Sequence, residues 1–218
     1  MNPSSASPQN LLDSDFELSI RQQPRQARMC GFGERDRRPI DPPPIIELRV
    51  RSPDPHAPSQ FLPPFQGLNF MLHAQLVSVS KPNRSLDLLA PVAGDGADEL
   101  VTVLMGSQVA SPIYCKDTAM QDGCFFIFPD LSVRTEGRYR LRFVLGQLCL
   151  NSDPGGDPSR VSHAIRAECF SDPFTVYAAK KFPGMTDSTD LTKCFARQGV
   201  KVMVRKARTS ESTRETAT

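Results

Sequence analysis

The residues best suited to chemistry in this sequence are arginines in a short segment near the amino terminus. They are Arg28, Arg35, Arg37 and Arg38. The stretch that holds them contains two glycines and ends in three consecutive prolines, which disfavours a helix. An arginine on such a loop can donate two parallel hydrogen bonds to a guanine edge or to a phosphate. The segment therefore fits a nucleic-acid-binding surface, although its composition also fits a solvated charged loop.

The charged residues of the chain are distributed in blocks. Residues 21–51 hold eight arginines against four acids, and residues 180–218 hold nine lysines or arginines against four acids. Residues 82–136 hold three basic and eight acidic side chains. Lys180 and Lys181 open the second basic block. A fold that joins the two basic blocks would create a surface for a polyanion, whereas separate blocks would be ordinary solvated faces.

Residue types that could catalyse a reaction or hold a metal are scattered. His56, His73 and His163 have no acid or nucleophile at a telling spacing, and the six cysteines form no C-x-x-C pair or Cys/His cluster. The G-x-G at Gly31–Gly33 does not follow a predicted strand and open a helix, as a nucleotide-binding loop does. We therefore expect a binding protein and not an enzyme, with no metal, no cofactor and no small-molecule substrate.

The amino-terminal residues and the cysteines bear on the cell compartment. Asp13, Asp15 and Glu17 lie among the first twenty residues, where a signal peptide would have a positively charged start and an apolar run. No apolar run reaches the length of a membrane span. We expect an intracellular chain without membrane contact, in which the cysteines are reduced.

The runs between prolines and glycines alternate with the two-residue period of β-strands. The predicted strands are 45–51, 70–77, 100–105, 123–128, 138–145, 174–177 and 200–205. In 138–145 we expect Tyr139, Leu141, Phe143 and Leu145 to point inward and Arg138, Arg140 and Arg142 to point outward. The apolar run 124–128 predicts a strand buried on both faces, and we expect strand 123–128 to pair with 138–145. Residues 51–68 and 151–164, rich in Pro, Gly, Asp and Ser, predict long loops. This spacing of strands is typical of a β-sandwich or barrel.

One segment near the carboxyl terminus has the period of a helix. Ser188 is the expected N-cap, Asp190 lies in the first turn, and Gly199 can end the helix. Its apolar stripe consists of Leu191, Cys194 and Phe195. The fold class is therefore all-β with one short C-terminal helix. We expect one domain over residues 16–208, with disordered tails at 1–15 and 209–218.

Three long strings resemble the fungal velvet domain and together span residues 20–206. They are RQQPRQARMCGFGERDRRPIDPPPIIELRV, GCFFIFPDLSVRTEGRYRLRF and SDPFTVYAAKKFPGMTDSTDLTKCFARQGVKVMVRK. The sequence is identified as a member of this family, and it resembles the small VosA-like and VelB-like members. The resemblance implies an immunoglobulin-like β-sandwich similar to the Rel homology DNA-binding domain. It also implies a transcription regulator of fungal development, sporulation and secondary metabolism, acting in the nucleus with or without exchange with the cytoplasm.

The partners that the resemblance implies are double-stranded DNA and a second velvet domain, from the same protein or from another member. In this picture the four arginines of the loop enter the major groove, and Lys180 and Lys181 contact phosphates. Phe61 and Phe65, in a proline-stiffened loop, are the expected dimer contacts, although the same loop can fold back on the sandwich. The alternative function is an interaction module that leaves contact with DNA to its partner.

Overall fold

The computed structural model describes residues 16–32, 37–50, 60–61, 69–79, 89–92, 99–150 and 161–205. For residues 60–61, 69, 89–92, 99–101, 148–150 and 161–163 it describes the backbone alone. The described chain forms strands β1 to β15 and one helix, α1 (Asp190–Arg197). The predicted all-β class with one short C-terminal helix is confirmed. The expected tails at 1–15 and 209–218 lie outside the described residues.

The first sheet, sheet A, has the strand order β1–β3–β11–β10, and β4 pairs with the end of β3. All of these pairs are antiparallel. The strands are β1 (Phe16–Gln22), β3 (Ile45–Val50), β4 (Gln60–Phe61), β10 (Ile113–Lys116) and β11 (Asp122–Ile127).

The second sheet, sheet B, has the order β2–β15–β13–β5–β9, and β14 also pairs with β13. Its strands are β2 (Gln26–Arg28), β5 (Asn69–Ser78), β9 (Val109–Ala110), β13 (Gly137–Leu150), β14 (Val161–Phe170) and β15 (Phe174–Tyr177). The β2–β15 pair is parallel, whereas the other pairs of sheet B are antiparallel. Two short ribbons complete the fold, β6 (Leu89–Val92) with β7 (Glu99–Thr102), and β8 (Leu104–Met105) with β12 (Ser132–Val133).

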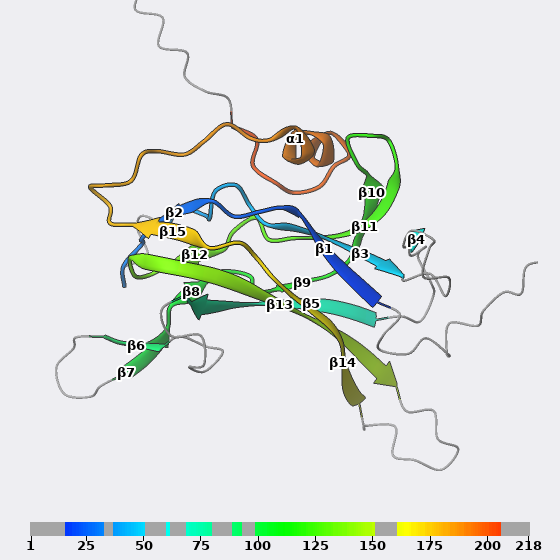
Figure 1. Cartoon of the computed structure of the whole chain (residues 1–218), viewed down its shortest axis with the longest axis horizontal. Helices are drawn as coiled ribbons and strands as arrows, with labels where there is room; N and C mark the ends of the chain where they lie inside the picture. Colours follow the sequence, from blue (N-terminus) through cyan, green and yellow to red (C-terminus); the bar gives the residue numbers. More distant parts are fainter. Residues whose placement is uncertain are drawn as a thin grey trace, which may run out of the picture.

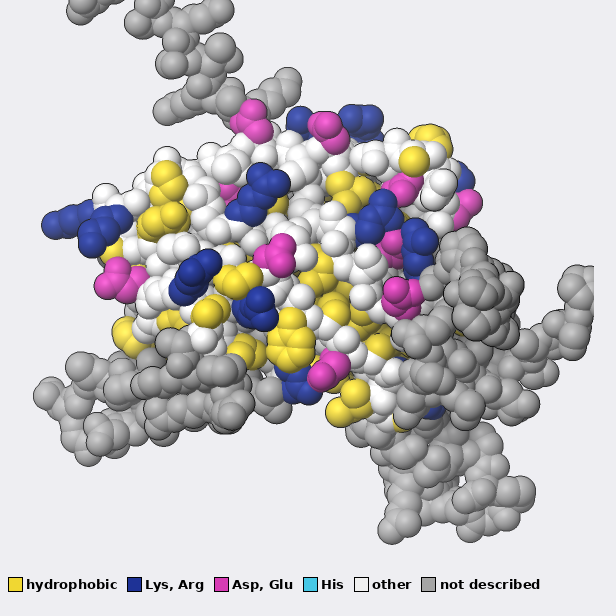
Figure 2. Space-filling view, viewed as in Figure 1, with side chains coloured by type: hydrophobic (Ala, Val, Ile, Leu, Met, Phe, Trp, Pro, Cys, Tyr) yellow, Lys and Arg dark blue, Asp and Glu magenta, His cyan; other side chains and the backbone are white. Residues whose placement is uncertain are grey.

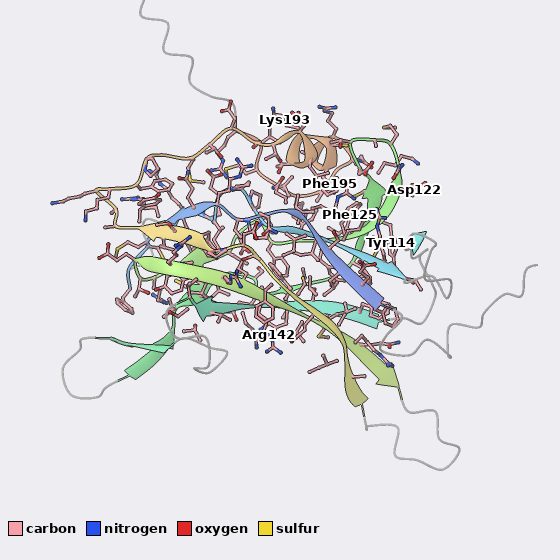
Figure 3. The ribbon with its side chains drawn as sticks, in the orientation of Figure 1. Tyr114, Asp122, Phe125, Arg142, Lys193 and Phe195 are labelled. Carbon is pink, nitrogen blue, oxygen red and sulfur yellow. The ribbon has the colours of Figure 1, made fainter. Side chains whose placement is uncertain are left out.

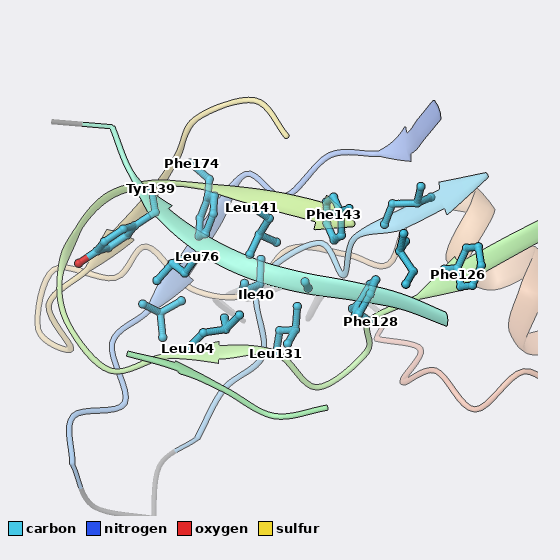
Figure 4. Packing of buried hydrophobic residues seen from close by; sticks show 14 of the residues in the cluster. Ile40, Leu76, Leu104, Phe126, Phe128, Leu131, Tyr139, Leu141, Phe143 and Phe174 are labelled. Atoms are coloured by element: carbon cyan, nitrogen blue, oxygen red, sulfur yellow. The ribbon is translucent and has the colours of Figure 1, made fainter. Parts of the chain in front are cut away.

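The main core lies between the two sheets, which form stacked layers in Figure 1. As predicted, Tyr139, Leu141 and Phe143 on β13 are buried. The ring of Phe143 meets that of Phe128, at a centroid distance of 5.4 Å (Figure 4). Alternate residues of an extended strand point to opposite faces, so the inward residues of each sheet fill one common core.

A second apolar cluster lies on the other side of sheet A, under α1 (Figures 1 and 3). It contains Ile45, Phe125 and Ile127 from the sheet and Phe195 from the helix. The rings of Phe125 and Phe195 are 4.8 Å apart at an angle of 54°. The prediction that the 124–128 run is buried on both faces is therefore confirmed, because its alternate residues enter the two clusters.

The helix begins one residue later than predicted. The N-cap is Thr189, whose Oγ1 accepts a hydrogen bond from the N–H of Thr192 at 3.1 Å. Ser188 is instead buried, and its Oγ accepts from the N–H of Arg205 at 2.9 Å. Asp190 lies in the first turn as predicted, and Gly199 follows the helix with φ of 86°.

Two predictions about strands are wrong. Strands 123–128 and 138–145 do not pair, because β11 lies in sheet A and β13 in sheet B, and they meet only across the core. Residues 200–205 form no strand. There the N–H of Val202 bonds to the C=O of Val200 at 2.8 Å in a tight turn, while both side chains pack against the cluster under α1.

Where the structure describes the predicted loops, it shows strands. Residues 161–164 belong to β14, and residues 51–59, 62–68 and 151–160 lie outside the described residues. Within 51–68, residues 60–61 form β4, and predicted strand 100–105 is divided between β7 and β8.

Candidate nucleic-acid interface

The parallel β2–β15 pair brings the two basic blocks to one end of the sandwich. Arg28 is in register with Tyr177, and the N–H of Met29 donates to the C=O of Tyr177 at 2.8 Å. Lys180 and Lys181 are exposed in the turn that follows β15. In Figure 1 this end is on the left, and Figure 2 shows Lys and Arg side chains there.

The arginine loop, residues 28–40, is described up to residue 32 and again from residue 37. Both described parts form hydrogen bonds with residues 131–134. The N–H groups of Cys30 and Gly31 donate to the C=O groups of Val133 and Arg134, each at 3.0 Å. In the second part, the N–H of Ile40 donates to the C=O of residue 131 at 2.7 Å. These bonds fix both ends of the loop beside β12, next to the end of β2.

Beyond Arg28, two of the predicted loop arginines, Arg37 and Arg38, are described, and Arg37 has bonds to the segment before β12 and to β12 itself. Arg37 donates from Nε to Ser132 Oγ at 3.0 Å and from Nη2 to the C=O of Asp130 at 2.7 Å. The carboxylate of Asp130 is a further partner, at 3.4 Å from Nη2. Arg38 is exposed. Arg37 therefore helps to hold the loop.

Arg134 is a residue of this surface that sequence reasoning missed. Its Nη1 donates to the C=O of Gly31 at 3.2 Å, and its Nε donates to the C=O of Thr102 at 3.2 Å. The guanidinium also lies 5.6 Å from the centre of the Phe32 ring, a cation–π distance. Arg134 lies inside the acidic block 82–136, so the charge blocks of the sequence do not point to it.

The other predicted contact residues are placed only in part. Arg35 and Phe65 lie outside the described residues. Phe61 belongs to β4, opposite Arg49 of β3, and its backbone alone is described. The structure therefore brings together Arg28, Arg37, Arg38, Lys180 and Lys181, and leaves the predicted dimer contacts untested.

A polar hollow on the outer face of sheet A is the other concentration of charge. It is lined by Glu17, Ser19, Arg21, Glu47, Arg49, Asp117 and Gln121. Arg21 joins Asp117 at 3.0 Å and Glu47 at 2.6 Å. Burial opposes the charge on Arg21, but its bonds to the two carboxylates outweigh burial and raise its pKa. Arg49 also pairs with Glu47, at 3.0 Å, so the ion pairs tie β1 and β3 to the turn after β10.

Three of the described cysteines are poor nucleophiles. Burial raises the pKa of Cys124 and of Cys169 to about 12, and that of Cys115 to about 11. Since the thiolate is the reactive form, these groups are inert near neutral pH. Cys30, Cys115, Cys124, Cys169 and Cys194 are free thiols.

Two further features concern the described part of the chain. Within it, no group of three or more His, Cys, Asp or Glu side chains is arranged to hold a metal ion. The helix found among these residues is too short and too polar to cross a membrane.

Comparison with known proteins gives one family. Residues 16–89 and 89–209 match the family model described as Velvet factor. The sexual development regulator umv3 of Mycosarcoma maydis is 39% identical over 191 residues, which are 87% of this chain and 45% of that protein. The sexual development regulator VELC of Pyricularia oryzae is 38% identical over 193 residues, 88% of this chain and 41% of that protein.

The developmental and secondary metabolism regulator veA of Emericella nidulans is 38% identical over 210 residues, 88% of this chain and 35% of that protein. The chain thus spans less than half the length of these three relatives. The names of the relatives include both sexual development regulators and a veA regulator, so the resemblance to VosA-like or VelB-like members stays a prediction.

Proposed function

This chain belongs to the velvet family, and we propose that it is a sequence-specific DNA-binding regulator of fungal development and secondary metabolism. The names of the relatives refer to sexual development, spore development and secondary metabolism. In this proposal the protein works in the nucleus as a velvet homodimer or heterodimer and catalyses no reaction.

The observation that carries the proposal is the meeting of two basic segments at one end of the sandwich. Arg28 on β2 and the turn with Lys180 and Lys181 after β15 are separated by about 150 residues in the sequence but are joined by the parallel strand pair. A positive surface of this kind attracts the DNA backbone and releases its counterions.

The two kinds of basic residue have different tasks in this proposal. Arg38, on a loop fixed at both ends, reads base edges in the major groove, while Lys180 and Lys181 hold phosphates. Arg37 and Arg134 set the shape of the loop through their bonds to Asp130, Ser132 and Gly31. One domain of this size has a limited footprint on DNA, which is why a dimer is part of the proposal.

Selection of bound sequences from a random duplex pool tests this function. The protein is used alone and together with a second velvet protein, and the affinity for the selected duplex is then measured over a range of salt concentrations. We expect a recovered motif and an affinity that falls steeply with salt, with a logarithmic slope that reflects several displaced counterions. If no duplex is retained at any salt, with or without the second protein, the interaction-module alternative replaces this proposal.

A further inference from the structure

A row of arginines lies on β13, on the face of sheet B that points away from the core. Arg138, Arg140 and Arg142 alternate with buried residues, and the first two are exposed. Alternate residues of a strand point to the same side and are about 7 Å apart, so the row is regular. Figure 3 shows Arg142 on the side of sheet B opposite α1.

The members of the row differ in their partners. Arg142 is held by Glu168, with Nε at 2.9 Å from the carboxylate, and by Gln75 at 3.3 Å. Within the described chain, the side chains of Arg138 and Arg140 form no hydrogen bond or ion pair. Two neighbouring positive charges are thus left without an internal partner.

The exposed pair continues the candidate nucleic-acid interface. Arg138 is opposite Thr175 on β15, and two residues further along β15 Tyr177 is opposite Arg28 on β2. Because these positions share the parity of the outward residues, Arg28 and Arg138 lie on the same face of sheet B. From the strand spacing, their Cα atoms are separated by two strands sideways and one repeat along the strands, about 12 Å.

We propose that Arg138 and Arg140 form a phosphate track, which holds the backbone of the duplex whose bases the arginine loop reads. This inference rests on the proposed function, because it assigns further contacts to the same DNA. A duplex fits the track better than an acidic protein surface does, since the charges are evenly spaced and continue directly from Arg28, Lys180 and Lys181. Contacts of this kind add affinity and register but no sequence preference.

The test compares the double variant Arg138→Ala/Arg140→Ala with a matched control, Arg197→Ala/Lys201→Ala. The control removes the same two positive charges from exposed positions at the end of α1, on the opposite side of the molecule. Binding of the selected duplex and of an unrelated duplex is measured at several salt concentrations, after thermal unfolding has confirmed that each variant is folded.

We expect the β13 variant to bind both duplexes about ten-fold or more weakly at physiological salt, by a similar factor for each. Its logarithmic salt slope should be smaller than that of the wild type by about 1.8, the value for two lost phosphate contacts. The control should keep the wild-type slope. The charge-preserving variant Arg138→Lys/Arg140→Lys should also keep it, because lysine holds phosphate as a point charge.

Three other results would overturn the phosphate track. If the wild type binds DNA and the β13 variant has an unchanged slope, the track is absent while the proposed function stands. Equal losses in the β13 variant and the control would mean that total charge, and not a contact, sets the affinity. If the wild type itself binds no duplex, the proposed function fails and the track fails with it.

Discussion

The outer faces of the two sheets differ in what covers them. On sheet A the outward positions include Ile45, Phe125 and Ile127, and α1 covers them with Phe195. On sheet B three successive outward positions of β13 are arginines, and none of the described elements forms a second apolar cluster over them. Both sheets show the same two-residue alternation. The kind of residue at the outward positions therefore decides which face the C-terminal segment covers.

Exposed apolar residues make the contrast sharper. Phe170 on β14 is 47% exposed on sheet B, whereas Phe195 is fully buried against sheet A. Burying a phenylalanine contributes about 1.5–3 kcal/mol relative to leaving it exposed. The α1 side gains this term, while the open side of sheet B keeps its charges in water, where a ligand can reach them.

The largest expected effect concerns the covered face. Phe195→Ala should reduce the free energy of unfolding by about 3–5 kcal/mol, because it leaves a cavity between α1 and Phe125. Phe170→Ala, the matched control on the open face, should cost less than about 1 kcal/mol. Urea unfolding followed by circular dichroism measures both values. Equal losses would show that the two faces are not different in packing.

A second comparison separates the two loop arginines. Replacing Arg37 and Arg38 together with Ala should weaken binding to the selected duplex by about 2–5 kcal/mol. Of the single variants, Arg37→Ala should cost about 1 kcal/mol of stability through its lost bonds to Ser132 and Asp130. Arg38→Ala should cost less than about 0.5 kcal/mol, because an exposed charge contributes little to stability. Binding isotherms and urea midpoints are needed for each. Unchanged DNA binding in the folded double variant would remove the loop as the reader.

The sequence predicts the strands better than their partners. Alternation in 138–145 identifies the buried Tyr139, Leu141 and Phe143, because each side chain reports the face on which it lies. It does not tell which strand lies alongside. Strand 123–128 joins sheet A through residues distant in sequence, a choice that only packing of the whole core decides.

The candidate site is predicted to a similar extent. The sequence shows that Arg37 and Lys180 are basic. The structure adds that Arg37 is hydrogen-bonded to Asp130, while Lys180 is exposed. Arg138 and Arg140 were predicted to point outward, but nothing in the sequence relates β13 to β2. Arg138 and Arg140 lie near Arg28 because β15 pairs with both β13 and β2. A site assembled across strands in this way becomes visible only with the topology.

A third test asks whether the edge of the covered sheet also carries the dimer contact. Phe61 lies on β4, at the end of β3. Phe61→Ala with Phe65→Ala should weaken association with a second velvet domain by at least about 2 kcal/mol, as expected for aromatic anchors. Sedimentation of the variant beside the wild type measures the association constant. An unchanged constant for an equally stable monomer would place the interface elsewhere.

The smallest expected effect concerns the buried carboxylate of Asp117, which is bonded to Arg21 on sheet A. Burial alone would raise the pKa of Asp117, but bonds from Arg21 and from the N–H groups of Gln121 and Ala119 outweigh it and lower the pKa below the ordinary 3.8. The stabilisation is therefore complete above that value and is lost as the pH falls through the folded pKa. Asp117→Asn should cost about 1–2 kcal/mol at pH 7, and the variant should lose less stability than the wild type as the pH falls into the acid range.

The control is Asp122→Asn, which breaks an exposed pair with Lys116 and should cost less than about 0.5 kcal/mol. Urea midpoints between neutral and acid pH distinguish the two, and equal acid sensitivity in the wild type and Asp117→Asn would assign the lost stability to other carboxylates.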